Sequence, residues 1–334
     1  MKNLQLGIDV GGTFTDFVLY NQNKNEFIAW KVLSTKENPV KGIVNGLEKI
    51  ERISEIGNIR LGTTIATNAL LERKGAKLAY ITTKGFKDVP FIQRGHRRSH
   101  YDMTWIKQKP LVERRYCFEI NERIDRDKNI VKELNYDDLT NIIKNIKKHN
   151  IESIAINLIF SYLNPINELK VKKYLEKHID IPISISYEVL PRWKEYERAS
   201  TTIADAYIKN IVSKQLSNTE KSLVDVGSTQ NIVIIKSNGG EMSIDMACKK
   251  PIETTVSGPT GGVVAAKYIS ENIDEENIVT IDMGGTSTDC STIVDGNISF
   301  TTSFELEWGL PIQIPMIDIR TIGAGGGSIA WVDK

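Results

Sequence analysis

The chain has few cysteines, no long apolar run and almost no net charge. Cys117, Cys248 and Cys290 are far apart and include no CxxC pair, so they fit reduced thiols rather than a metal or redox pair. No apolar run reaches the roughly 18 residues that a membrane helix needs, and the N-terminus lacks the apolar core of a signal peptide. Because the chain has 43 basic and 42 acidic residues, its net charge does not favour binding to nucleic acid or to an anionic membrane. We therefore expect a cytoplasmic protein without nucleic-acid or membrane partners.

The rest of the composition is that of an ordinary globular protein, with 40% hydrophobic and 25% charged residues. At 334 residues the chain is long enough for two domains. Strand and helix patterns alternate along most of it, which favours an α/β fold. Strand patterns occupy residues 4–10, 13–20, 26–31, 59–61, 77–82, 153–158, 181–186, 231–236 and 277–283, and helix patterns occupy 136–149, 165–178, 193–223 and 261–269. Residues 84–130 break this rhythm and predict an insertion or a long functional loop.

One internal repeat is the most informative feature of the sequence. The segment IDVGGTFTD, from Ile8 to Asp16, recurs as IDMGGTSTD, from Ile281 to Asp289, with seven of nine positions identical. Each copy stands where an apolar strand turns sharply into a second strand. One copy alone is equally typical of an ordinary hairpin with a glycine turn, but two copies favour a shared role. We therefore expect two hairpins, at residues 4–20 and 277–294, whose glycine turns face a common cleft.

The residue types in this repeat suit a polyphosphate and a hard metal ion. Paired glycines let backbone amides approach an anion closely, and threonine hydroxyls add donors for phosphate oxygens. A carboxylate at the end of a strand can hold Mg²⁺ directly or through water. The candidate catalytic residues are Asp9 and Asp282, as Mg²⁺ ligands, and Asp16 and Asp289, one of which orients a water. The candidate phosphate contacts are Gly11, Gly12, Thr13, Thr15, Gly284, Gly285, Thr286 and Thr288.

These paired hairpins resemble the two phosphate motifs of the actin, sugar-kinase and heat-shock-chaperone ATPase superfamily. The small-residue segment from Thr255 to Ala266 resembles the connecting helix of that fold and stands just before the second hairpin. Taken alone, a small-residue helix could equally reflect close packing. The resemblance implies an α/β fold of the actin-like, ribonuclease H-like type, with ATP and Mg²⁺ as cofactors.

Further segments resemble the hydantoinase A / 5-oxoprolinase family. They begin at Leu61 (LGTTIATNALLERKG), Glu195 (EYERASTT), Ser237 (SNGGEM) and Thr321 (TIGAGGGSIA), and they follow the family's order. The family includes N-methylhydantoinase A-like proteins, other ATP-dependent hydrolases of cyclic amides, and subunits of acetone and acetophenone carboxylases. The resemblance implies a small-molecule cyclic amide as substrate, a hydantoinase B-like partner subunit, and a homo- or hetero-oligomer.

Members of this family are about twice as long as the present chain. The resemblance therefore implies the N-terminal half only, with the first actin-like lobe complete and the second truncated. On this basis residues 1–185 form an N-terminal region with an insertion at about 84–130. Residues 186–334 form a truncated hydantoinase A region, with connecting helices at 191–275 and the start of the second lobe at 276–334. We expect an unpaired edge or exposed apolar surface in that last part, with these candidates: Ile312, Ile314, Met316 and Ile317.

The densest polar cluster is the segment from Arg94 to Asp102, which corresponds to a basic loop in the family. It faces substrate or the γ-phosphate, or it is a solvated loop. The candidate substrate residues are Arg94, His96, Arg97, Arg98 and Asp102. His96 and His100 have the i, i+4 spacing of a helical metal pair, but no acidic third ligand is evident nearby.

Other polar features have simpler explanations. Glu195, Glu197 and Arg198 open a long helix, where surface ion pairs are the expected role. The run from Gly323 to Gly327 either approaches a phosphate or forms a flexible turn. Cys290 follows the second motif directly, and we expect a packed thiol there because no base stands at a telling spacing.

The favoured function is ATP-dependent hydrolysis of a cyclic amide of the hydantoin, N-methylhydantoin or 5-oxoproline type. An unstrained amide is a poor electrophile, and phosphorylation of its oxygen by ATP creates a leaving group, so that water can open the ring. The protein then positions the amide oxygen in line with the γ-phosphorus and neutralises charge. Three alternatives stay open: a subunit of a ketone carboxylase, a sugar kinase, and a non-catalytic partial subunit. The cysteine-rich zinc motif of one large sugar-kinase group is absent from the sequence.

Overall fold

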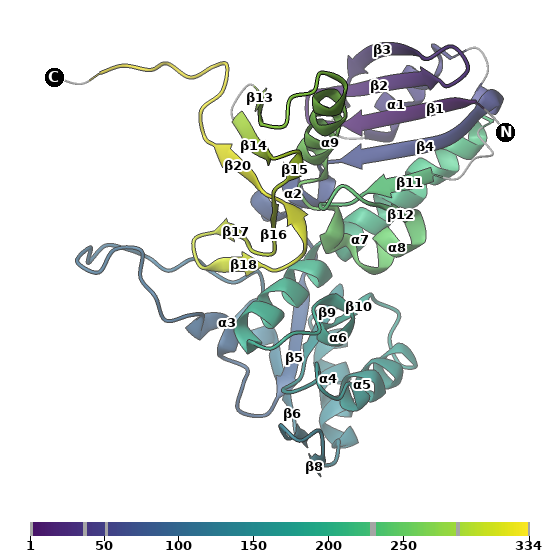
Figure 1. Cartoon of the computed structure of the whole chain (residues 1–334). Helices are drawn as coiled ribbons and strands as arrows, with labels where there is room; N and C mark the ends of the chain where they lie inside the picture. The colour runs from purple at the N-terminus through teal and green to yellow at the C-terminus, as the bar shows by residue number, and fades with distance from the viewer. Residues whose placement is uncertain (1–2, 36–38, 51–52, 228–231, 285–287, 333–334) are drawn as a thin grey trace.

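The computed structural model of the chain describes residues 3–35, 39–50, 53–227, 232–284 and 288–332 (Figure 1). Within these ranges the chain builds two sheets joined by a long helix, and a third sheet that contains the second copy of the repeat. The α/β class expected from the sequence is confirmed.

The first sheet has the strand order β12-β11-β4-β1-β2-β3. Its strands are β1 (Leu4–Val10), β2 (Phe14–Asn21), β3 (Glu26–Leu33), β4 (Ile56–Thr63), β11 (Ile232–Ile235) and β12 (Glu241–Ser243). Strand β1 pairs antiparallel with β2 on one side and parallel with β4 on the other. Leu6, Ile8 and Val10 are buried and alternate with more accessible residues, because successive side chains of a strand point to opposite faces.

Helix α1 (Pro39–Leu47) packs on the sheet face that carries Leu6, Ile8 and Val10. A β-carbon at Gly46 would stand only 2.1 Å from the ring of Phe17 in β2, so glycine allows the helix to approach the sheet closely. The indole N–H of Trp30 donates to the carbonyl oxygen of Gly46 at 3.0 Å.

The second sheet has the order β10-β9-β5-β6, and each neighbouring pair is parallel. Its strands are β5 (Leu78–Thr83), β6 (Cys117–Ile120), β9 (Ser153–Asn157) and β10 (Ile183–Ile185). Strands β5 and β9 are buried along their whole length, as is usual for parallel strands with both faces covered. Helix α4 (Tyr136–Lys148) contacts β6, and α5 (Ile166–Glu176) contacts β10.

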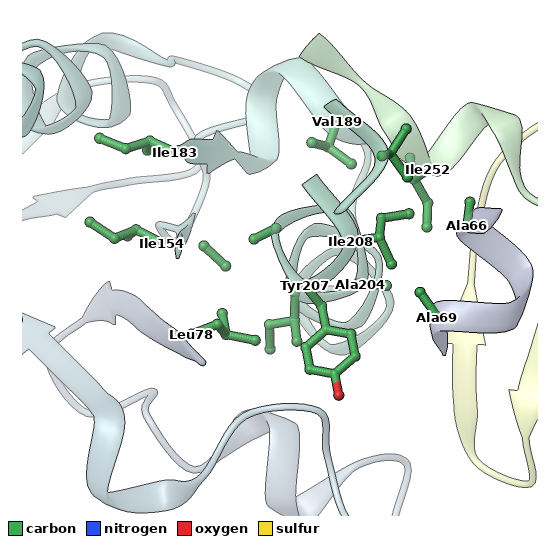
Figure 2. Close-up of a cluster of buried hydrophobic side chains, with 14 of the residues drawn as sticks. Ala66, Ala69, Leu78, Ile154, Ile183, Val189, Ala204, Tyr207, Ile208 and Ile252 are labelled. Carbon is green, nitrogen blue, oxygen red and sulfur yellow. The ribbon is translucent and has the colours of Figure 1, made fainter. Parts of the chain in front are cut away.

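Helix α7 (Glu195–Asp225) is the element that joins the two parts. Figure 2 shows its residues Ala204, Tyr207 and Ile208 with side chains of the second sheet on one side. On the other side lie Ala66 and Ala69 of α2 (Ile65–Leu71), the helix that follows β4 (Figure 2). One continuous core therefore runs through the helix from one part to the other.

The third sheet contains β13 (Ile278–Met283), β14 (Thr288–Val294), β15 (Asn297–Ile298) and β20 (Ile319–Ile322). Helix α9 (Ser257–Asn272) contacts both β4 of the first sheet and β13 of the third (Figure 1). The shorter elements are η1 (Ile53–Glu55), α3 (Val89–Ile92), η2 (Arg114–Tyr116), β7 (Arg123–Ile124), β8 (Ile130–Lys132), α6 (Ser186–Val189), α8 (Ile244–Lys249), η3 (Pro251–Thr254), β16 (Phe300–Thr301), β17 (Phe304–Glu307), β18 (Leu310–Ile312) and β19 (Met316–Ile317).

The sheets include strands from both sides of the predicted boundaries, and the division at residue 185 stays a prediction. Strand β6 lies inside the segment 84–130 and pairs with β5, so the stretch without helix or strand is shorter, at residues 93–113. The first sheet takes β11 and β12 from beyond residue 185, whereas residues 78–185 supply the second sheet. A division at residue 185 therefore cuts across the first sheet, because β4 and β11 are parallel neighbours that lie far apart in the sequence.

The apolar residues expected to be exposed near the end of the chain are buried. Ile312, Ile314, Met316 and Ile317 are at most 3% exposed. The N–H of Gln313 donates to the Thr201 hydroxyl of α7 at 3.0 Å, and the N–H of Ile317 donates to the Ser237 carbonyl at 2.9 Å. The prediction of exposed surface at these four positions is wrong, because α7 and the loop after β11 cover them.

Candidate functional site

The first copy of the repeat forms the β1–β2 hairpin, in which Asp9 pairs across the strands with Asp16. The Gly11 N–H donates to the Phe14 carbonyl at 3.1 Å and closes the turn. The Ser34 hydroxyl donates to the Gly11 carbonyl at 2.8 Å and holds the turn from the end of β3. Since side chains alternate along a strand, Asp9 and Asp16 point away from the face that α1 covers.

The second copy forms the β13–β14 hairpin in the same register, with Asp282 paired to Asp289. Gly284 is exposed at the start of the turn. Gly285 and Thr286 lie outside the described residues. The prediction of two matching hairpins is confirmed for the strands that flank both turns.

Both hairpins turn their aspartates toward α9. The hollow beside the first hairpin is lined, among others, by Asp9, Asp16, Gly258, Gly261 and Gly262. The hollow beside the second is lined, among others, by Asp282, Asp289, Gly262, Val263 and Ala266. The glycine and alanine residues of α9 leave room at its surface, and Gly262 lines both hollows. Helix α9 therefore adjoins the hollows of both hairpins.

Charges from both hairpins act on the carboxyl of Asp9. Its side chain is open to solvent, but the walls of the hollow replace much of the surrounding water, and this desolvation raises the pKa of its carboxyl above the ordinary 3.8. The negative charges of Asp16 and Asp282 raise the pKa of Asp9 further. Because Coulombic effects fall with distance, Asp282 lies near enough to Asp9 to change its pKa.

The surroundings of Asp9 fit a hard cation. A β-carbon at Gly62 of β4 would stand 2.9 Å from Asp9 Oδ1, so this glycine keeps the space beside the carboxylate open, and Gly258 of α9 lies in ordinary contact distance, at 3.8 Å. A bound cation relieves the repulsion between neighbouring carboxylates. Mg²⁺ is usually bound through one or two carboxylates together with water and phosphate oxygens. Asp9 and Asp282 match that donor set.

Two of the expected phosphate contacts point elsewhere. The Thr15 hydroxyl shares a hydrogen bond with the Ser34 hydroxyl at 2.9 Å, and Thr15 is buried. The Thr288 hydroxyl donates to the Ala324 carbonyl at 2.6 Å. The expectation that these hydroxyls face a phosphate is wrong, because strand alternation places them on the face opposite to Asp16 and Asp289. Gly12 and Thr13 are exposed at the tip of the first turn.

Residues after β20 contribute to the second hairpin. The Gly326 N–H donates to the Gly284 carbonyl at 2.9 Å, and the Thr321 hydroxyl donates to Asp289 Oδ1 at 2.6 Å. The glycine run at 323–327 therefore lies against the second turn. Thr321 and Gly62 were not expected at the site. Their signals in the sequence were only that they belong to family-like segments.

The basic loop lies apart from the hairpins. It projects from α3, beside the β17–β18 hairpin and away from β1 (Figure 1). Arg94 forms ion pairs with Glu197 of α7 at 2.9 Å and with Glu305 of β17 at 2.7 Å, so it ties the base of the loop to both elements. The other candidate substrate residues, His96, Arg97, Arg98 and Asp102, are exposed.

The two histidines of this loop do not form a helical metal pair. His96 and His100 lie on irregular backbone, so the i, i+4 spacing does not place them on one helix face. Across the described parts of the chain, no three His, Cys, Asp or Glu side chains gather as metal ligands.

The residues that open α7 are buried rather than at the surface. Arg198 is 0% exposed. Its guanidinium donates to the Asn157 side chain at 2.7 Å and to the Leu158 carbonyl at 2.8 Å, and burial lowers its pKa. Glu197 is also buried and pairs with Arg94. The expectation of surface ion pairs is wrong for Glu197 and Arg198, because α7 packs on the ends of β5 and β9.

Two family models match almost the whole chain. The hydantoinase/oxoprolinase N-terminal region matches residues 5–179, and the hydantoinase/oxoprolinase model matches residues 198–334. The chain belongs to the hydantoinase/oxoprolinase family. This confirms the resemblance drawn from the repeat and the four further segments. The gap between the two matches contains the start of α7.

Curated relatives match nearly all of this hydantoinase/oxoprolinase chain. A protein of Methanocaldococcus jannaschii is 38% identical over 99% of the chain and 51% of its own length. Caprolactamase subunit alpha of Pseudomonas jessenii is 30% identical over 99% of the chain and 49% of its own length. The 5-oxoprolinase of Saccharomyces cerevisiae is 32% identical over 98% of the chain and 29% of its own length. The chain thus spans about half the length of the first two relatives and less of the third.

Two solved structures have the same α/β fold. ATP-dependent caprolactamase from Pseudomonas jessenii matches with a TM-score of 0.88 and 28% identity, over 98% of this chain and 49% of that chain. Nucleotide-free acetone carboxylase matches with a TM-score of 0.85 and 29% identity, over 97% of this chain and 48% of that chain. Among the described residues, no helix is long and apolar enough to cross a membrane.

Proposed function

We propose that this chain is part of an enzyme that uses ATP to hydrolyse a cyclic amide, and that its two hairpins bind the nucleotide phosphates. The observation that carries the proposal is the equal register of the hairpins, which turns Asp9 and Asp282 toward the same helix. The relatives named ATP-dependent caprolactamase and 5-oxoprolinase support the choice of ATP and of a cyclic amide. The actin-like division into two lobes is part of this proposal.

The chemistry follows from the low reactivity of an amide. The amide oxygen attacks the γ-phosphorus and ADP leaves, so the amide carbon becomes a better electrophile. Water then adds to that carbon and the C–N bond of the ring breaks, which frees the amine and leaves an acyl phosphate. A second water hydrolyses the acyl phosphate to the carboxylate and phosphate. In this scheme the backbone N–H groups of both turns bind phosphate oxygens as charge moves during transfer. These turns contain Gly11, Gly12, Thr13, Gly284, Gly285 and Thr286.

The four aspartates divide the remaining work. Asp9 and Asp282 would hold Mg²⁺, which would supply positive charge against the triphosphate. Asp16 and Asp289 accept hydrogen bonds from water at the same face, and one of them orients the attacking water. The hydroxyl of Thr321 holds one carboxylate oxygen of Asp289 and leaves the other for that water.

We assign the cyclic amide to the basic loop, through His96, Arg97, Arg98 and Asp102, with Arg94 as its anchor. The loop leaves the carboxyl end of β5, and the sheet order β10-β9-β5-β6 makes the boundary of β5 and β9 a topological switch point. Open α/β sheets bind ligands at such points. In-line transfer needs the amide oxygen within about 3–3.5 Å of the γ-phosphorus, so the loop and the cleft must approach in the complete enzyme.

The proposal extends beyond the region that this chain spans. The first two relatives are about twice as long as the region that matches, and several relatives are named as subunits. We therefore include in the proposal the second half of a family chain and a hydantoinase B-like subunit.

A subunit of a ketone carboxylase is the second candidate, favoured by the structural match to acetone carboxylase. The two candidates differ in substrate, and phosphate release by the complete enzyme separates them. Stimulation by caprolactam, 5-oxoproline or hydantoin, with formation of the ring-opened amino acid, is the expected result. Stimulation by acetone or acetophenone with bicarbonate, and by no cyclic amide, would replace the proposal with the alternative.

A further inference from the structure

Neighbouring parallel strands of the second sheet bring an arginine and two aromatic rings together just past their carboxyl ends. The residues are Phe160, Phe86 and Arg123, and each is the third residue after its strand, β9, β5 and β6 respectively. The central carbon of the Arg123 guanidinium lies 5.4 Å from the centre of the Phe86 ring and 5.8 Å from that of the Phe160 ring. The arginine is therefore held at the carboxyl ends of β5 and β9.

The N–H groups of this arginine are not used by the protein. The Arg123 guanidinium forms no hydrogen bond or ion pair with any residue that the structure describes, and the side chain is half-buried. The preceding residue, Glu122, is buried and accepts hydrogen bonds from Thr83 and Asn167 instead. A guanidinium carries several donors, and it cannot act as an acceptor. These donors are therefore available to a molecule that comes from solution.

The position of Arg123 is fixed although its donors are free. Stacking on aromatic rings orders a guanidinium and leaves the N–H groups in its plane unoccupied. Phe160 has a φ of 59°, a left-handed conformation that is unusual for a bulky side chain. Its carbonyl accepts from the N–H groups of Leu163 and Asn164 at 2.9 and 3.1 Å, which holds this conformation. Strained backbone of this kind persists only where the surrounding structure holds it, and it is common at ligand sites.

This arginine lies where open α/β sheets bind ligands. From β5 the chain continues to β6 on one side, whereas from β9, on the other side of β5, it continues to β10. Connections that leave in opposite directions open a crevice at the carboxyl ends of the strands. The basic loop at residues 94–102 starts near the same end of β5, but it includes none of Phe86, Arg123 and Phe160. The inference drawn from these three residues goes beyond the proposed function and does not rest on it.

We infer that Arg123 binds the carboxylate of a small organic acid, whose apolar part lies against Phe86 or Phe160. A guanidinium fork matches the two oxygens of a carboxylate with two parallel hydrogen bonds. Phosphate groups are usually bound by clusters of arginines or by helix N-termini. Arg198 lies over the next ring, Tyr162, but it supplies no second fork because its guanidinium already donates to three acceptors inside the protein. One free fork beside apolar rings therefore suits a monoanion with an apolar body.

The test measures the binding of benzoate to this chain by calorimetry, with benzamide as its uncharged analogue and inorganic phosphate as a second anion. We expect benzoate to bind at least about tenfold more tightly than either of the others. Arg123→Lys keeps the charge but loses the fork, so it should weaken benzoate binding by about tenfold or more. The matched control is Arg126→Lys, at an exposed arginine of the turn between β7 and β8, which should stay within about twofold of the unmodified chain.

Phenylglyoxal, which modifies arginine side chains, provides a second measurement that needs no variant. Benzoate should slow the modification of Arg123, followed by mass spectrometry, and leave that of Arg126 unchanged. The inference is wrong if benzoate does not bind, if benzamide or phosphate binds as tightly, or if benzoate does not protect Arg123. It is also wrong if Arg123→Lys binds benzoate normally or loses no more affinity than Arg126→Lys. Asp9→Ala should bind benzoate normally even if nucleotide binding fails, which separates this inference from the proposed function.

Discussion

Asp9 stands in β1 with a second carboxylate across the hairpin and a glycine on each of two neighbouring elements. The spacing of the repeat predicted the two carboxylates, since both belong to one short segment. It did not predict the glycines, because Gly62 comes from β4 and Gly258 from α9, and long-range packing brings them to Asp9. The sequence analysis also missed the direction of the Thr15 hydroxyl, which strand alternation turns into the core.

Gly62→Ala tests the space beside the carboxylate. Its new methyl group would stand 2.9 Å from Asp9 Oδ1, closer than van der Waals contact allows, so the carboxylate must move. We expect the affinity for Mg·ATP to fall by about tenfold or more. Gly7→Ala is the control, because the nearest atom to its methyl group is 3.8 Å away. Equal affinities of both variants would show that the gap has no role.

Glu122→Gln tests a buried carboxyl that follows β6 of the second sheet. Burial raises the pKa of Glu122 above its ordinary 4.5, although hydrogen bonds from Thr83 and Asn167 oppose the shift. A raised pKa in the folded state gives stability that is present below pH 4.5 and is lost as the pH rises through the folded value. The melting temperature of the unmodified chain should therefore fall over that window more than that of Glu122→Gln. Parallel curves from pH 4.5 to 8 would contradict this assignment.

At the scale of elements, the periodicity of apolar residues and the turn residues predicted most strands and helices. They did not predict which strands pair with one another. The hairpins were predicted because each is local in sequence. The pairing of β4 with β11 was not, because all four strands of the second sheet lie between them in the chain. The apolar residues from Ile312 to Ile317 indicated only that another element must bury them, and α7 packs against them.

Ile208→Ala tests whether α7 contributes to the core on both of its sides. Ile208 is fully buried between the second sheet and the elements beside α2 (Figure 2). Loss of a buried isoleucine should lower the free energy of unfolding by about 2–5 kcal/mol. Ile211→Ala, at an exposed position of the same helix, should change it by about 0.5 kcal/mol or less. Urea unfolding measures both, and similar losses would mean that α7 is not a common core element.

Arg97→Ala tests the basic loop without touching the hairpins. The Arg97 guanidinium lies over the Trp105 ring and donates to the Asp102 carbonyl, so it shapes the tip of the loop. In the complete enzyme we expect a several-fold higher KM for the cyclic amide with unchanged affinity for Mg·ATP. Arg126→Ala, on the exposed turn between β7 and β8, is the control. An unchanged KM for Arg97→Ala would return the loop to the role of a solvated surface loop.

At the scale of the whole molecule, the chain carries both copies of the repeat but covers only one of them. The sequence predicted membership of the family, because its motifs occur in order along the full chain. It did not predict where the uncovered surface lies, since burial depends on contacts between distant segments. The exposed face is on β13, beside the aspartates, rather than at Ile312 to Ile317. Val279 and Ile281 line the same hollow as Asp282 and Asp289.

The most direct test of the central claim is the affinity of the complete enzyme for Mg·ATP, measured by calorimetry alongside ATP turnover. Asp9→Ala and Asp282→Ala each remove a charge that, in the proposed function, holds Mg²⁺ against the triphosphate. We predict that each abolishes turnover on every substrate, while the exposed-site control Asp180→Ala behaves like the unmodified enzyme. Near-normal binding and turnover in Asp9→Ala would contradict the account.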